Sequence, residues 1–273
     1  MGQPLETKFF LVGDVAGRYS ELEELLKDIP NETKVIFVGD AINKGPNSKE
    51  VLELIIANPN YQLLLGNHEF QLIEAIEDLN RQEMEAKAEL SHTWLETKAA
   101  ATIKSYLPDS DISNNPDNTL RSFNQELTNC GHLDYLIHRP ILYYYPGLVV
   151  SHSPSPTPWL MPLIKNLGLE NDSVEIGVHL AEKTFFLRTK EKICEQGTTP
   201  FHLDEFLSYR KKPKKGDGQI HVFGHVSRWG FKKFTDKEDR LIAICIDNSS
   251  KNKLIGLHWP SLKKVKVKNH KLP

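Results

Sequence analysis

The chain has 273 residues, of which 39% are hydrophobic and 26% charged, and its formal net charge is −2. This composition is that of a globular protein with a substantial core, and the near-neutral charge excludes a global field that attracts nucleic acid or membranes. Three widely spaced cysteines, no apolar run near the roughly 20 residues of a membrane span and no secretory signal lead us to expect a cytoplasmic protein without disulfides.

Three short apolar runs open the chain, and each ends in a glycine and a polar residue. They are FFLVGD at 9–14, VIFVGD at 35–40 and YQLLLGN at 61–67. Continuous apolar runs of this length predict strands buried on both faces. The segments between them, SELEELLKDI and SKEVLELII, carry apolar residues at helical spacing. This alternation of strand and helix predicts parallel βαβ units and an α/β fold.

The rest of the chain has a different pattern. Residues 70–108 have a strongly helical sequence, whereas 109–118 are rich in Asp, Asn and Ser and predict a loop. Five positive charges with a proline and two glycines at 210–218 predict an exposed connection, and the basic C-terminal residues predict an edge strand or a tail. Further strands are expected at 140–145, 148–153, 220–225 and 241–247.

Side chains that bind metals follow five of the predicted strands. They are Asp14, Asp40, Asn67, His152 and His225. Taken alone, each is also typical of a turn or of a core histidine. As an ordered set they predict a metal site, because ligands bind beyond the carboxyl ends of strands in open α/β sheets. Carboxylate, amide and imidazole groups suit divalent ions such as Mn²⁺, Fe²⁺ or Zn²⁺.

The ordered motifs GDVAG, GDAINKGP, GNHE, VSHS and FGH resemble those of the calcineurin-like metallophosphoesterases. Within that superfamily they are most similar to the phosphoprotein phosphatases and the bacterial symmetrical bis(5′-nucleosyl)-tetraphosphatases. The resemblance covers residues 9–70 and 140–258. It implies a four-layer αββα sandwich, with residues 1–273 as one domain and residues 71–139 as a helical insertion or cap. GHVS at 224–227 lacks the second histidine of phosphodiesterase branches, which favours a phosphatase.

The resemblance also implies which residues hold two divalent ions. Asp40 would bridge the ions, and Asp14 would hold the first of them. The binding site of the second ion would be completed by Asn67, His152 and His225, and Asn67 would also contact the phosphate. Hydroxide held between the two ions would attack phosphorus.

Other roles follow from the same resemblance. His68 would be the general acid that protonates the leaving oxygen, with Asn43 beside it as a second catalytic residue. Lys44 and Arg188 would hold the phosphate, and Arg210 is the alternative to Arg188.

Three positions depart from the pattern of the family. Ala16 replaces a histidine that binds the first metal, so we expect this first site to be weakened. Asn43 replaces an aspartate; it still accepts a hydrogen bond but supplies no charge to raise the pKa of His68. Lys44 replaces an arginine and keeps the charge without the bidentate fork. The change at Ala16 is compatible with natural divergence or with an engineered loss of the histidine.

Three functions therefore remain open. The favoured one is a metal-dependent phosphatase that hydrolyses a phosphoprotein or a small phosphorylated molecule. The second is a hydrolase of dinucleoside polyphosphates. The third is a catalytically impaired pseudo-phosphatase that binds phosphorylated partners. Ala16 and Asn43 favour the third function. The first two are favoured by five intact site residues, which are Asp40, Asn67, His68, His152 and His225.

Overall fold

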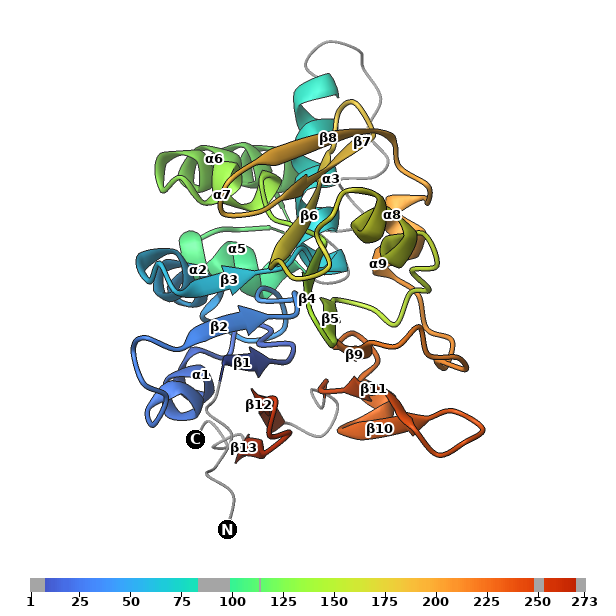
Figure 1. Ribbon diagram of the computed structural model, residues 1–273. Helices are drawn as coiled ribbons and strands as arrows, with labels where there is room; N and C mark the ends of the chain where they lie inside the picture. The colour runs from blue at the N-terminus through green and yellow to red at the C-terminus, as the bar shows by residue number, and fades with distance from the viewer. Residues whose placement is uncertain (1–7, 83–98, 113, 248–252, 269–273) are drawn as a thin grey trace.

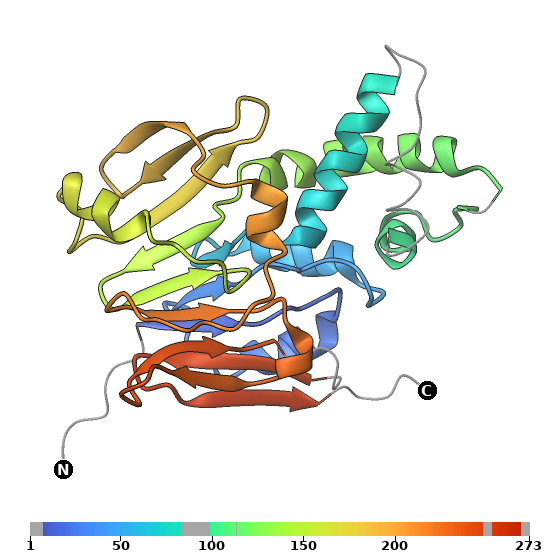
Figure 2. The same ribbon diagram turned by 90° about the vertical axis from the view of Figure 1, so that its right-hand side faces the viewer.

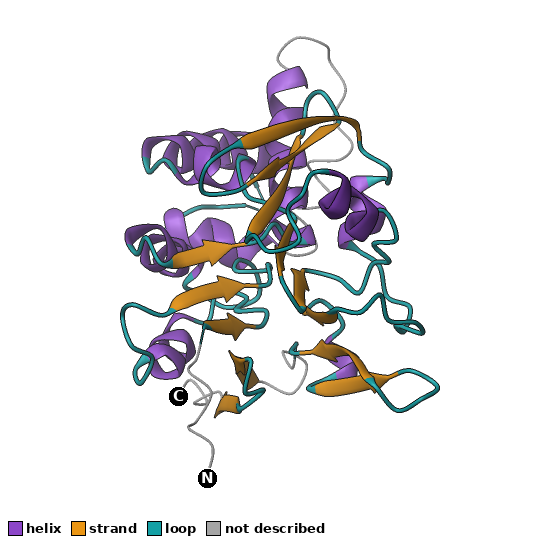
Figure 3. Ribbon diagram, in the orientation of Figure 1, coloured by secondary structure: helices purple, strands orange, loops and turns teal. Residues whose placement is uncertain are grey.

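The computed structural model describes residues 8–82, 99–112, 114–247 and 253–268. In these residues two β-sheets pack face to face, and helices lie on the outer sides of the sheets (Figures 1 and 3). This arrangement confirms the predicted α/β sandwich. Within the described part of the chain, no helix is long and apolar enough to cross a membrane.

The first sheet has five strands, and two helices connect its parallel members. Along the chain these elements are β1 Phe9–Val12, α1 Tyr19–Leu26, β2 Lys34–Phe37, α2 Ser48–Ala57, β3 Tyr61–Leu63, β12 Lys253–Trp259 and β13 Lys264–Lys268. The strand order is β13-β12-β1-β2-β3. Strands β1, β2 and β3 run parallel, as the alternating pattern predicted. The basic C-terminal segment forms the edge strand β13.

The second sheet has eight strands in the order β10-β11-β9-β5-β4-β6-β7-β8. They are β4 Leu142–Tyr145, β5 Leu148–Ser151, β6 Val174–His179, β7 Thr184–Arg188, β8 Ile193–Thr198, β9 Ile220–Phe223, β10 Lys232–Thr235 and β11 Leu241–Cys245. Strands β5, β9 and β11 run parallel, and the other neighbours are antiparallel. The strands β6, β7, β8 and β10 were not predicted from the sequence, and neither was β12 of the first sheet.

The core between the sheets consists of side chains that alternate along the facing strands. The first sheet contributes Leu11 and Ile36, and the second contributes Val150, Val222 and Ile244. Each of these side chains is fully buried. Burying an aliphatic side chain of this size stabilises a fold by about 1.5–3 kcal/mol. This core fixes the two sheets against each other and therefore fixes the ends of their strands.

The outer face of the second sheet is covered in two ways. Near β6 and β7 it is covered by helices α8 Leu160–Asn166 and α9 Leu203–Leu207. Stacked aromatic rings join the two helices to each other, Trp159 with Phe201 and Phe201 with Phe206, and Trp159 also contacts Phe185 of β7 edge to face. Over β9 and β11 the cover is the 3-10 helix η2 Ser227–Trp229 and an irregular segment that leads from α9 to β9 (Figure 2).

A group of helices lies above the first sheet (Figure 2). They are α3 Asn67–Gln82, α5 Ala100–Tyr106, α6 Pro116–Asn129 and α7 His132–Ile137. They agree with the helical character expected for 70–108, of which 83–98 lies outside the described residues. The loop expected at 109–118 is shorter, because Pro116 opens α6: the fixed φ of proline and its missing N–H suit the first turn of a helix. A capping role for 71–139 remains a prediction.

Candidate metal centre

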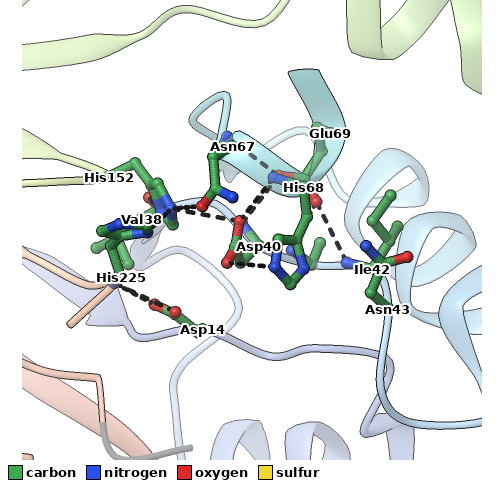
Figure 4. A network of polar contacts seen from close by, with 12 residues as sticks. Asp14, Val38, Asp40, Ile42, Asn43, Asn67, His68, Glu69, His152 and His225 are labelled. Atoms are coloured by element: carbon green, nitrogen blue, oxygen red, sulfur yellow. Dashed lines mark hydrogen bonds and ion pairs between the residues drawn. The ribbon is translucent and has the colours of Figure 1, made fainter. Parts of the chain in front are cut away.

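Five strands of the two sheets end at one edge of the sandwich, and each is followed by a side chain that can bind a cation (Figure 4). These side chains are Asp14 after β1, Asp40 after β2, Asn67 after β3, His152 after β5 and His225 after β9. Within each sheet the strands concerned are parallel, so their carboxyl ends reach the same edge. The structure therefore brings together all five residues that the sequence suggested as metal ligands.

Asp40 and two histidines form the tightest part of this cluster. Asp40 Oδ1 lies 3.3 Å from His152 Nε2, which lies 3.2 Å from His225 Nδ1. One ligand atom from each of the three lies within 4.8 Å of the others, and all three side chains are buried. The amide oxygen of Asn67 adds a fourth donor atom, 2.9 Å from His152 Nε2. These are the nitrogen and oxygen donors that zinc, iron and manganese accept in proteins.

The hydrogen bonds of His152 also fit a cation at this position. Its Nδ1 lies 3.0 Å from the carbonyl oxygen of Val38, which accepts the Nδ1–H and leaves the Nε2 lone pair facing the cluster. That lone pair then meets the oxygen atoms of Asn67 and Asp40. Electron-rich atoms that converge in this way repel one another, and a bound cation removes the repulsion.

The electrostatics of the cluster are those of a cation site. Burial, together with Asp247 and Asp40, raises the pKa of Asp14 well above its usual value. Although burial opposes the ionisation of Asp40, the fields of His152 and the neighbouring histidines lower its pKa. Burial and the neighbouring His152 lower the pKa of His225 to about 3. This imidazole is therefore neutral at physiological pH, which is the form that binds metals.

Several residues at the site have left-handed backbone conformations that side chains other than glycine rarely adopt. The φ angles are 53° at Ala16, 53° at Asp40, 71° at Asn43, 63° at Lys44 and 61° at His225. Such residues cost free energy and persist where the surrounding structure over-determines them. Their concentration in the loops after β1, β2 and β9 indicates that these loops are held to present particular side chains.

Glycines before the ligands are required by close packing. A Cβ at Gly224 would collide with the carboxylate of Asp14, and a Cβ at Gly66 would collide with the backbone amide of Asp40. The amide of His225, which follows Gly224, donates to Asp14 Oδ1 and Oδ2 at 3.1 and 3.2 Å. The Gly-Asp, Gly-Asn and Gly-His pairs of the sequence thus reflect the close approach of neighbouring loops.

Glu69 is a site residue whose role the sequence did not indicate. Its carboxylate is buried and accepts hydrogen bonds from the backbone amides of Gly66, Asp40, Ala41 and Ile42 at 2.8–3.2 Å. Burial and the nearby charge of Asp40 raise its pKa. Glu69 therefore ties the loop after β2 to the start of α3 and holds Asp40 in place. The sequence feature that could have indicated this role is the position of Glu69 directly after His68 in the GNHE motif.

His68 and Asn43 occupy different surroundings. His68 Nε2 lies 3.6 Å from Asp40 Oδ2, and the His68 amide donates to Asp40 Oδ1 at 3.1 Å. Asn43 is fully buried, and its Oδ1 accepts a hydrogen bond from Thr102 Oγ1 at 2.7 Å. The Asn43 amide donates to the same hydroxyl at 2.9 Å. Thr102 belongs to α5, so the helical segment contacts the edge of the site.

The cations suggested for phosphate binding are not placed alike. The positive charge of Lys44 partly offsets the rise that burial causes in the pKa of Asp14, and that of Arg210 adds to the effect of burial in lowering the pKa of His225. Both cations therefore lie near the cluster. Arg188 does not: it lies 3.9 Å from Glu175, which also contacts Lys34 at the start of β2, opposite the end that carries Asp40. The strand position of Arg188 gave no information on which end of the sheet its side chain would reach.

The position of the missing histidine is closely held. Ala16 is 1% exposed, its amide donates to the Asp40 carbonyl at 2.8 Å, and its carbonyl accepts from the Gly45 amide at 2.9 Å. Asp247, which follows β11, is buried and contributes to the raised pKa of Asp14. Asp247 was not predicted as a site residue from the sequence. Position 16 thus offers no ligand atom from its side chain, but Asp247 places a third acidic side chain near Asp14 and Asp40.

The fold and this cluster define an α/β sandwich protein with a candidate metal centre. Its sequence matches the family model of the calcineurin-like phosphoesterases over residues 7–248. The chain therefore belongs to the calcineurin-like phosphoesterase family.

The chain is also similar to curated proteins. The chain is 42% identical over 67 residues to a symmetrical bis(5′-nucleosyl)-tetraphosphatase of Coxiella burnetii, a match that covers 23% of each protein. It is 26% identical over 178 residues to the protein of that name from Marinomonas sp., which covers 61% of this chain and 53% of the relative. The chain thus spans about a quarter of the length of the first relative and about half of the second.

Two solved structures are similar in outline. A putative diadenosine tetraphosphatase has a TM-score of 0.48 at 17% identity, with 99% of this chain and 97% of that chain covered. A metallophosphoesterase from Sphaerobacter thermophilus has a TM-score of 0.44 at 13% identity, with 95% and 86% covered. The family assignment rests on the family match alone.

Proposed function

We propose that the protein is a metal-dependent phosphoesterase that hydrolyses small phosphorylated molecules. The observation that carries the proposal is the convergence of Asp40, His152 and His225, whose ligand atoms lie within 4.8 Å of one another at the carboxyl edge of two sheets. Of the candidate substrates, dinucleoside polyphosphates are favoured over phosphoproteins and simple phosphomonoesters, because the curated relatives are named symmetrical bis(5′-nucleosyl)-tetraphosphatases.

In this proposal the metal is held by Asp40, Asn67, His152 and His225, with Asp14 directed to the first site. Manganese, iron and zinc all suit these donors. A divalent ion bound there lowers the pKa of water and withdraws charge from the phosphoryl oxygens. The side chains contribute position: buried loops with fixed backbone angles and the hydrogen bond from His152 to Val38 hold the donor atoms before any ion arrives.

His68 is the proposed proton donor. It lies in the first turn of α3, directly after Asn67, and its Nε2 faces Asp40 at 3.6 Å. A leaving alkoxide or phosphate is expelled faster when it receives a proton in the transition state. The negative field of Asp40 favours the protonated form of His68. Lys44 and Arg210 are the proposed cations that neutralise the phosphate charge.

The test is hydrolysis of diadenosine tetraphosphate and p-nitrophenyl phosphate with increasing Mn²⁺. Formation of ADP alone from the dinucleotide indicates symmetrical cleavage. The Asp40→Asn variant should lose at least about 10–100-fold in kcat/KM, because even loss of an outer-shell partner has that effect. Absence of hydrolysis from protein that demonstrably holds metal would instead favour the pseudo-phosphatase.

A further inference from the structure

A second hollow lies outside the metal cluster, on the outer face of β9 and β11. It has a volume of about 540 Å³, within the roughly 300–1,000 Å³ of small-molecule sites. Its walls are residues 154–158, which follow β5, and residues 209–217, the irregular segment that leads to β9. We call this cavity the outer pocket.

The outer pocket has an apolar floor and a cationic rim. Phe223 and Ile242 lie at its floor, and prolines contribute to its wall. The rim carries four exposed lysines, Lys211, Lys212, Lys214 and Lys215. Within the described residues, none of the four forms an ion pair with an acidic side chain. A pocket of this kind complements a ligand that combines an apolar, planar part with negative charge.

The polar groups inside the outer pocket differ in whether they already have a hydrogen-bond partner. The Asp217 carboxylate already has a hydrogen-bond partner, since its Oδ2 lies 3.0 Å from His221 Nε2. Thr157 is 6% exposed, and its hydroxyl oxygen has no hydrogen-bond partner among the described residues. A buried hydroxyl without a partner destabilises the folded protein. A ligand that hydrogen bonds to Thr157 would remove that destabilisation.

The outer pocket adjoins the metal cluster. Ser153 directly follows His152, and the hydroxyls of Ser153 and Ser155 both donate to the Phe206 carbonyl. These bonds tie the segment after β5 to the segment that carries Tyr209, another lining residue. The positive charge of Arg210, the next residue, adds to the effect of burial in lowering the pKa of His225. The segment 206–210 therefore lies beside both the outer pocket and the metal cluster.

We propose that the outer pocket binds the nucleoside end of a nucleotide substrate. The base would lie against Tyr209 and the apolar floor, Thr157 would hydrogen bond to the nucleoside, and the rim lysines would contact the phosphates. Stacking of a base on an aromatic side chain stabilises binding with little dependence on which base is present. The proposal rests on the proposed function, because it names the substrate class of that enzyme.

The first test is direct calorimetric binding of ADP to metal-depleted protein. The double variant Lys214→Gln/Lys215→Gln should bind ADP roughly tenfold more weakly, a change of about 1.4 kcal/mol. The matched control is Lys190→Gln/Lys192→Gln, which removes two exposed lysines at the turn between β7 and β8 and should bind like the parent. Equal ADP affinity of the two double variants would overturn the proposal.

The second test separates the nucleoside from the charge. Tyr209→Ala should weaken binding of ADP but not of pyrophosphate, whereas Tyr209→Phe should restore ADP binding. Thr157→Val should raise the melting temperature of the ligand-free protein, because the unpartnered hydroxyl is removed, and should weaken ADP binding. Pyrophosphate binding as tight as that of ADP, or unchanged ADP binding in Thr157→Val and Tyr209→Ala, would refute a nucleoside site.

The outcome for the outer pocket is distinguishable from that for the proposed function. Hydrolysis of p-nitrophenyl phosphate by the parent protein reports the metal chemistry without a nucleoside. If the parent hydrolyses this compound while the rim variants bind ADP normally, the outer pocket fails and the function stands. If the rim variants lose ADP binding but the parent shows no hydrolysis, the outer pocket stands and the function fails.

Discussion

At the scale of single residues, the backbone of Ala16 matters as much as its side chain. Ala16 has a φ of 53° and is hydrogen bonded to the loop that carries Asp40. The left-handed region is unfavourable for most residues, but histidine is found there several-fold more often than average. The backbone conformation of Ala16 is therefore one that a histidine can adopt.

Restoring a histidine at this position should therefore increase metal binding and activity. Ala16→His should add an imidazole to the first site beside Asp14 and Asp40, and raise kcat/KM by about tenfold or more, equivalent to about 1.4 kcal/mol. Metal analysis and hydrolysis at saturating Mn²⁺ check the expectation. Ala16→Leu is the control, with similar bulk and no ligand atom; an equal rise in that variant would reject the ligand explanation.

His68 should affect substrates according to how much their leaving groups need a proton. His68→Asn should lower turnover by about 10²-fold for a poor leaving group, and by much less for p-nitrophenyl phosphate, whose leaving group is stable as an anion. His138→Asn, which changes an exposed histidine on the helical segment, should be neutral. Equal losses on both kinds of substrate would exclude His68 as the general acid.

At the scale of elements, α5 is the contact between the helical segment and the site. Thr102 on α5 binds the side chain and the amide of Asn43, and Tyr106 at the end of the same helix packs against Phe123 of α6 and His132 of α7. The hydroxyl of Tyr106 lies 2.6 Å from His132 Nδ1. The packing of three helices therefore determines how firmly Thr102 holds Asn43.

The pair of Tyr106 and His132 should make this segment sensitive to acid. Burial, and then the charge of Lys49, lower the pKa of His132. An unfolded histidine takes up a proton below about pH 6.5, whereas the folded imidazole resists it. The stability that the neutral pair provides is therefore present above about pH 6.5 and is lost as the pH falls through the lower folded pKa.

Urea unfolding at two pH values checks this expectation. His132→Asn should lower the free energy of unfolding by about 1–3 kcal/mol at pH 7.5, and the difference from the parent should shrink at pH 5. His138→Asn should behave like the parent at both pH values. A penalty for His132→Asn that grows on acidification would show that the imidazole is protonated when folded.

Individual elements differ in how far the sequence reveals them. The strands β1 and β2 were predictable because both faces are buried, which gives continuous apolar runs. The strand β8 was missed because much of it is exposed and its sequence ICEQGT has no apolar pattern. Asp14, Asp40 and the histidines were found because they follow strands. The positions of three side chains relative to the site depend on packing between distant segments, which strand and helix patterns do not report. These are Thr102, Asp247 and Arg188.

At the scale of the whole molecule, metal content should follow the unequal composition of the two sites. In the proposed assignment the second site has all its donor residues, whereas the first would lack an imidazole at position 16. Elemental analysis after exhaustive dialysis should find about one divalent ion per chain. Removing it with a chelator should lower the melting temperature, since an ion at about 100 times its Kd stabilises by about 2.7 kcal/mol.

The control for metal content is Asp40→Ala, which should retain no ion after dialysis and show no response to the chelator. Two tightly held ions in the parent protein would contradict the unequal sites. That result would direct attention to Asp247, whose buried side chain lies near Asp14, as the replacement for the missing imidazole.

The hydrogen bond between the His225 amide and Asp14 joins residues 211 positions apart in the chain. Closing so long a loop is entropically costly, and contacts of large sequence separation slow folding. The metal centre can exist only after the first strand and the ninth strand have met. Because no such arrangement exists in the unfolded chain, the free energy of metal binding is also free energy of folding. Metal uptake by the proposed centre would therefore come late in folding, because a growing polypeptide cannot complete the centre until β9 has emerged from the ribosome.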